Sequence, residues 1–249
     1  MTTKKSIDSF IKSFSKKRHF TKVDLFNYYS QSEPDLKDGT LRRRINILKN
    51  RGLIHEVGRG IYTFQNKQTW IPVIDKPIKS LYNKIADNYT DLNFTVWSTA
   101  WLGEFTNLQA FHYLVIISVE KDFAASVFEY LKETGLKNLY FKPDKKEINY
   151  YLGDTKETYI ITTLITKSPV QSIEKNKIPK LEKILVDLFC DKDLFNAFQG
   201  AELKNIFRKA FDTYSINLSV LFNYSGRRGK KIELPEYLTK NLKIKGRRN

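Results

Sequence analysis

The residues with the clearest chemical potential form one short basic stretch, Thr40-Leu-Arg-Arg-Arg-Ile-Asn-Ile-Leu-Lys-Asn50. At about 100° per residue, Leu41, Ile45 and Leu48 fall on one face, which predicts a helix that buries them. The donors on the remaining face suit phosphates and the guanine and adenine edges in the major groove of DNA. The residues predicted to contact DNA here are Thr40, Arg42, Arg43, Asn46 and Lys49, with Asn50 on the same side.

Two helices are predicted before this stretch and would position it. Phe10, Ile11 and Phe14 share one face of the first helix. The second helix runs from about residue 22 to 32. It has Thr21 as a plausible N-cap and an apolar stripe made by Leu25, Phe26 and Tyr29. A turn-rich segment, residues 32–39, separates it from the third helix.

A small hairpin is predicted after the third helix, which Gly52 closes as a C-cap. Residues 53–57 and 61–64 are typical of two strands, joined by Gly58-Arg59-Gly60 with glycines where positive φ angles are needed. This order of elements indicates a winged helix-turn-helix with Arg59 at the wing tip. The alternatives are a basic helix face that is merely solvated, and a winged helix that binds protein or RNA.

A second group of basic residues lies near the C-terminus, in Ser225-Gly-Arg-Arg-Gly-Lys-Lys231 and in residues 240–248. The two glycines of the first segment predict a flexible loop whose cations would contact phosphates as point charges. The alternative is a frayed, solubilising tail over the last 24 residues. The residues predicted to contact the DNA backbone are Arg227, Arg228, Lys230 and Lys231.

The distribution of charge supports a polyanionic partner. The 249 residues carry a net charge of +16. Residues 1–70 and 171–249 carry +9 and +8, whereas residues 71–170 carry −1. A charge that served solubility alone would be spread more evenly, so double-stranded DNA is the expected partner. The single cysteine, Cys190, and the lack of a signal peptide or membrane-spanning run predict a cytoplasmic protein without disulfides.

Signals for catalysis are weak. The three histidines, His19, His55 and His112, lack metal-type spacing, and no phosphate-binding or nucleophile motif occurs. We therefore expect no catalytic residues, cofactor or metal. A nuclease built on scattered carboxylates stays open as the alternative, and metal-dependent cleavage of nucleic acid would distinguish it. Asp191 or Asp193 is expected to cap a helix, and Trp97 and Trp101 to share a helical face in the core.

The chain is predicted to divide near residues 65–77, where Pro72 and Pro77 interrupt the periodic patterns. Residues 1–68 would be the winged helix and residues 69–249 a mixed α/β domain with a helical, basic C-terminal part, an α/β (α+β) fold. The elements predicted in the second domain are helices at 78–89 and 123–133, strands at 113–119, 139–142 and 159–166, and helices near 181–188, 193–214 and 216–224.

The chain also resembles the AbiEi-type antitoxins of type IV, abortive-infection toxin–antitoxin systems. The resemblance rests on Gly52-Leu-Ile-His-Glu-Val-Gly-Arg-Gly-Ile-Tyr62, Trp97-Ser-Thr-Ala-Trp101, residues 178–188, and residues 216–224 leading into Gly226-Arg-Arg-Gly229. It implies a DNA-binding transcriptional repressor that binds promoter repeats and autoregulates its operon. It also implies that the second domain counters a nucleotidyltransferase-like toxin.

Overall fold

Three helices and a small sheet form the N-terminal part of the computed structural model, which describes residues 4–15, 17–107, 112–151 and 157–244. The sheet is antiparallel, with strand order β1-β3-β2. The predicted order of three helices and a hairpin is present, with one short additional strand. The elements are α1 (Lys4–Phe14), β1 (Phe20–Thr21), α2 (Lys22–Ser30), α3 (Asp38–Asn50), β2 (His55–Gly58) and β3 (Ile61–Thr63).

Local sequence accounts for the start of α2. The side chain of Thr21 accepts a hydrogen bond from the backbone N–H of Asp24, and the Asp24 carboxylate accepts one from the backbone N–H of Thr21. This reciprocal capping box confirms Thr21 as the N-cap. The predicted apolar stripes are only partly correct, because Ile11 and Phe26 are each 37% exposed whereas Phe10, Phe14 and Leu25 are buried.

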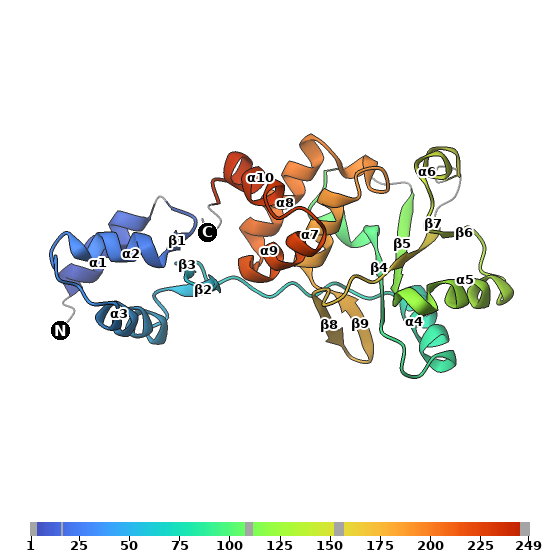
Figure 1. The fold of residues 1–249 in the computed structure, drawn as a ribbon, viewed down its shortest axis with the longest axis horizontal. Helices are drawn as coiled ribbons and strands as arrows, with labels where there is room; N and C mark the ends of the chain where they lie inside the picture. The colour runs from blue at the N-terminus through green and yellow to red at the C-terminus, as the bar shows by residue number, and fades with distance from the viewer. Residues whose placement is uncertain (1–3, 16, 108–111, 152–156, 245–249) are drawn as a thin grey trace.

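A four-stranded mixed sheet forms the centre of the second part, with strand order β4-β5-β7-β6. Strand β4 is antiparallel to β5, and β5, β7 and β6 are mutually parallel. Figure 1 shows this sheet and its helices at the end of the molecule opposite α1–α3. The elements are α4 (Lys76–Asn88), β4 (Phe94–Ser98), β5 (Tyr113–Val119), α5 (Ala124–Glu133), β6 (Leu139–Phe141), α6 (Lys145–Tyr151) and β7 (Glu157–Thr163).

The two tryptophans correct one prediction. Trp97 lies in the middle of strand β4, and Trp101 lies in the short 3-10 helix η1 (Thr99–Glu104) that follows. They do not share a helical face, because the strand ends between them. Their core location is confirmed: Trp97 is fully buried and Trp101 is 9% exposed.

Helices dominate the rest of the chain, after a hairpin of β8 (Val170–Ile173) and β9 (Asn176–Pro179). They lie between the N-terminal helices and the four-stranded sheet (Figure 1). They are α7 (Leu181–Cys190), α8 (Ala201–Thr213), α9 (Leu218–Arg227) and α10 (Glu233–Leu242), with the short 3-10 turn η3 (Asn196–Phe198) between α7 and α8. A second such turn, η2 (Lys121–Phe123), precedes α5 in the sheet region.

Two predictions for the C-terminal part are wrong. Residues 225–227 form the last turn of α9 and not a flexible loop, and this turn is held by the burial of Tyr224 and Ser225. The alternative of a frayed tail does not hold for residues 233–244, because Leu234, Leu238, Leu242 and Ile244 enter the main core. The predicted frayed end, residues 245–249, lies outside the described residues. Asp191 and Asp193 do not cap α8, whose N-cap is Gly200.

The mixed α/β (α+β) fold class is confirmed by these helices and sheets. Two clusters of buried apolar side chains form the cores, one drawn from residues 10–62 and one from residues 57–244. Val57 and Ile61 of the hairpin belong to the second cluster although they precede the predicted boundary. No helix in the described part of the chain is long and apolar enough to cross a membrane.

Candidate nucleic-acid interface

Helix α3 is oriented by its buried face. Leu41, Ile45 and Leu48 are each less than 5% exposed and pack with Phe20, Leu25 and Ile54 in the N-terminal core. This confirms the predicted buried face. Because a helix turns by about 100° per residue, the centre of the opposite face is formed by Arg43, Asn46 and Asn50. All three are exposed, as is Thr40 at the start of the helix.

Acidic side chains engage the cations on the two flanks of this face. On one flank, Arg42 contacts Asp38 at 2.8 Å and Lys49 contacts Glu56 at 2.5 Å. On the other, Arg44 contacts Glu33 at 2.6 Å and lies over the ring of Tyr29. Arg42 and Lys49 were predicted from the sequence to contact DNA. In the structure both are already engaged in ion pairs within the protein.

The carboxylates on the flanks are held in their charged form. The pKa of the Asp38 carboxyl is lowered, chiefly by a hydrogen bond from Lys22 and by the nearby Arg42. Partial burial raises the pKa of the Glu56 carboxyl, but hydrogen bonds from Lys49 and the backbone N–H of Gly60 outweigh this effect and lower it. The Asp38 and Glu56 carboxylates are therefore charged at neutral pH and offset the charges of Arg42 and Lys49 on this flank.

The central residues of the outer face have a different environment. Among the described residues, no ion pair or side-chain hydrogen bond engages Arg43, Asn46 or Asn50. A guanidinium suits the O6 and N7 atoms of guanine, and a carboxamide suits the N6 and N7 atoms of adenine. The arrangement thus presents one free cation and two amides at the centre of an exposed helix face.

The hairpin tip lies against the second part of the molecule. The backbone N–H of Arg59 donates to Oγ of Ser219 on α9 at 2.8 Å, while the Arg59 side chain is exposed. Gly60 has a φ of +70°, as the turn was predicted to require. The same prediction is wrong for Gly58, whose φ is not positive and whose hydrogen side chain instead allows close approach to α9.

The two C-terminal arginines differ sharply. Arg227 is exposed on α9, whereas Arg228 is 17% exposed and contacts Asp191 at 2.5 Å and Asp187 at 3.8 Å. Burial alone would lower the pKa of the Arg228 guanidinium, but the two carboxylates outweigh it and raise the pKa above its usual value. Arg228 was predicted to bind phosphate; the structure instead places it in a buried ion network.

That network was missed at the sequence level. Lys183 contacts Asp187 at 2.6 Å, and the hydroxyl of Tyr224 donates to the same carboxylate at 2.8 Å. Both charged residues lie on α7, where residues 181–189 are all buried. The available signal was a Lys and an Asp four residues apart within an otherwise apolar helix, a spacing that allows an ion pair on one face.

The remaining predicted cations are partly engaged. Lys230 contacts Glu233 at 3.0 Å, whereas Lys231 is exposed and lies over Gly226. His55 is partly buried on strand β2, where the sequence predicted a packing role. In the described residues, no group of three or more His, Cys, Asp and Glu side chains could hold a metal ion.

Comparison with known proteins finds a matching family but no activity. A model of a family of unknown function (DUF6577) matches residues 40–244. The match begins in the first turn of α3 and ends at Ile244, the last described residue, so it includes the hairpin and the whole second part. No curated protein matches, and no solved structure matches.

Proposed function

The chain belongs to this family of unknown function, and we propose that it binds double-stranded DNA sequence-specifically by placing α3 in the major groove. The observation that carries the proposal is the outer face of α3. Its central donors, Arg43, Asn46 and Asn50, are exposed and free of acidic partners among the described residues. Three cations on its flanks, Arg42, Arg44 and Lys49, are paired with carboxylates.

This pairing pattern favours readout of bases over general attraction to phosphate. A surface that served only nonspecific binding would gain from every free cation, because each phosphate contact adds counterion release. Here the flanking carboxylates reduce the affinity that the flanking cations could gain from phosphates. The unpaired donors lie at the centre of the helix face. The order of three helices followed by a hairpin supports the same use, since α3 lies across one exposed side of the N-terminal core.

In this proposal the protein is a transcriptional repressor. The resemblance to AbiEi-type antitoxins supports autoregulation through promoter repeats and a role against a nucleotidyltransferase-like toxin. The net positive charge of residues 1–70 and 171–249 supports a DNA partner independently of that resemblance.

Selection of duplexes from a random-sequence pool by the full chain tests the proposal. We expect one sequence to be enriched. Arg43→Ala and Asn46→Ala should each weaken binding to that sequence by roughly 1–3 kcal/mol, about 10- to 100-fold, and weaken scrambled DNA much less, because each loses a bidentate base contact.

The matched control is Lys12→Ala, which removes an exposed cation from α1 in the same part of the molecule. Failure to enrich any sequence would refute the proposal. Equal sequence preference in the Arg43, Asn46 and Lys12 variants would refute it as well, because the recognition surface would then lie elsewhere.

A further inference from the structure

The hairpin is packed tightly onto α9. A Cβ atom at Gly58 would lie 3.1 Å from the backbone nitrogen of Ser219 and 3.3 Å from Cβ of Leu218. At this distance the backbones of β2 and α9 touch directly, and the Arg59 N–H completes the contact by donating to Ser219 Oγ. The tip of the predicted wing is therefore not a free loop.

Further contacts beside the hairpin hold the two parts together. Arg18 forms an ion pair with Asp212, and Lys67 donates to the carbonyl oxygen of Phe211 at the end of α8. The backbone N–H of Ser215 donates to the carbonyl oxygen of Gln68 at 2.9 Å. Together with Val57 and Ile61, which enter the main core, these contacts fix α9 relative to the hairpin.

The exposed face of α9 begins at this contact and is polar and basic. Ser219, Asn223 and Arg227 recur every four residues and therefore lie along one side of the helix. Asn223 and Arg227 are exposed, and Lys231 lies over Gly226 on the same side. We group them with the exposed Arg59, whose backbone N–H contacts Ser219, as the wing–α9 strip: Arg59, Asn223, Arg227 and Lys231.

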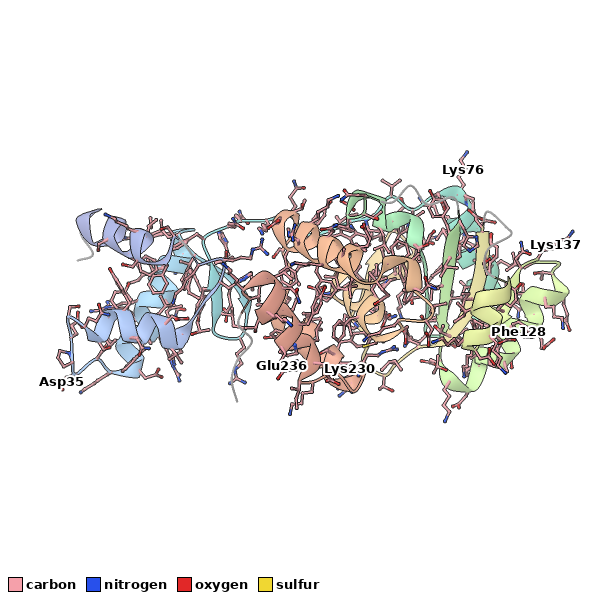
Figure 2. The ribbon with its side chains drawn as sticks, turned by 90° about the horizontal axis from the view of Figure 1, so that it is seen from above. Asp35, Lys76, Phe128, Lys137, Lys230 and Glu236 are labelled. Atoms are coloured by element: carbon pink, nitrogen blue, oxygen red, sulfur yellow. The ribbon has the colours of Figure 1, made fainter. Side chains whose placement is uncertain are left out.

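Nearby acidic residues define the limit of the strip. Glu233 pairs with Lys230, and Glu236 lies in the same first turn of α10, near Lys230 in Figure 2. Lys230 is therefore not part of the strip. Among the described residues, no acidic partner engages Arg59, Arg227 or Lys231.

We propose that the wing–α9 strip binds the phosphate backbone of the same duplex that α3 reads, on the flank beyond the hairpin. The proposal rests on the DNA-binding function proposed above. Arginine, lysine and asparagine side chains are donors for phosphate oxygens. Because the hairpin is fixed to α9, this contact adds binding without the cost of ordering a loop.

The test uses the full chain and two duplexes that carry the selected sequence, one without flanks and one extended by about two helical turns, ~10 base pairs each. On the extended duplex, Arg227→Glu with Lys231→Glu should weaken binding by roughly 10- to 100-fold and reduce the salt slope by about 2, since each lost phosphate contact removes ~0.9. On the short duplex the loss should be within about twofold.

The matched control is Lys76→Glu with Lys137→Glu, which changes charge equally at the end of the molecule remote from α3 (Figure 2). Equal affinity and salt slope of the two double variants on the extended duplex would overturn the proposal. An equal loss on both duplexes would overturn the assignment to the flank. If Arg43→Ala still reduces sequence preference in either case, only the proposal for the strip is refuted and the proposal for α3 stands.

Discussion

At the scale of single residues, neighbouring side chains of one type differ in what they can do. Arg227 and Arg228 are indistinguishable in the sequence, yet one is exposed and the other is held between two carboxylates. Likewise, Arg42, Arg43 and Arg44 are consecutive, and among the described residues only Arg43 of the three lacks an acidic partner. Such differences depend on residues distant in sequence, such as the Asp191 that pairs with Arg228. The periodicity of the sequence around Arg228 does not predict such a partner.

His19 illustrates a residue whose burial has a measurable consequence. It lies between the two parts of the molecule, 6.3 Å from the ring of Phe211. Burial, with smaller effects of Arg18 and Lys67, lowers the pKa of its imidazole to about 4. In the unfolded chain the pKa returns to about 6.5, so the unfolded state binds more protons at intermediate pH.

We therefore predict that stability falls as pH is lowered from about 6.5 to about 4, by about 3 kcal/mol at most from this residue. Above pH 6.5 the contribution is complete, because both states are neutral. His19→Gln should flatten the profile in chemical denaturation at several pH values, whereas His55→Gln, on strand β2, should not. A profile of His19→Gln as steep as that of the parent chain would contradict the prediction.

At the scale of elements, strongly patterned segments were predictable and context-dependent ones were not. Helix α3, the hairpin strands and strand β5 follow from local spacing, which acts within a few residues of the chain. Strand β4 was missed because Trp97 and Trp101 suggested a helical spacing, whereas the equally buried β5 is marked by its run of β-branched residues. Helix α9 was predicted to end at Tyr224, because Gly226 and Gly229 indicate a loop and its extension to Arg227 depends on the buried Ser225.

The candidate site was likewise predictable only where it depends on local spacing. The helix face that includes Arg43 and Asn46 follows from the positions of three apolar residues. The pairing of Arg42 and Lys49, and the contact between Arg59 and Ser219, require residues from other elements. Because Ser219 lies 160 residues from Arg59, only the tertiary structure brings them together.

Two glycines of the N-terminal part give a matched prediction about the packing of elements. Gly58→Ala should destabilise the protein by about 1–3 kcal/mol, because the new methyl group would press on the backbone of α9. Gly39→Ala should stabilise it by up to ~1 kcal/mol, since Gly39 lies in α3 with open space around it and alanine favours a helix.

Thermal and denaturant unfolding of both variants measure these effects. If Gly58→Ala were as stable as Gly39→Ala, β2 would not be packed against α9 in solution. The fixed wing–α9 strip would then lose its structural basis.

At the scale of the whole molecule, the two cores are joined through the hairpin. The N-terminal core is formed within residues 10–62 and supports the prediction that a fragment ending near Gln68 folds alone. The hairpin also contributes Val57 and Ile61 to the second core. In an isolated fragment these two side chains would meet solvent, so the fragment should be less stable than the same residues in the full chain.

Val57→Ala separates the stability that the second core adds to the hairpin from the stability of the N-terminal core itself. In the full chain Val57 is 6% exposed within the second core, so its truncation should cost about 1–3 kcal/mol through lost packing. In the fragment of residues 1–68 the same change should cost less than about 0.5 kcal/mol, because the side chain is already on the surface. Leu48→Ala, within the N-terminal core, is the control and should destabilise both forms by about 2–5 kcal/mol. Denaturant unfolding of the four variants measures the difference. Equal costs of Val57→Ala in fragment and full chain would mean that the hairpin does not depend on the second core, and that the two parts are separate folding units.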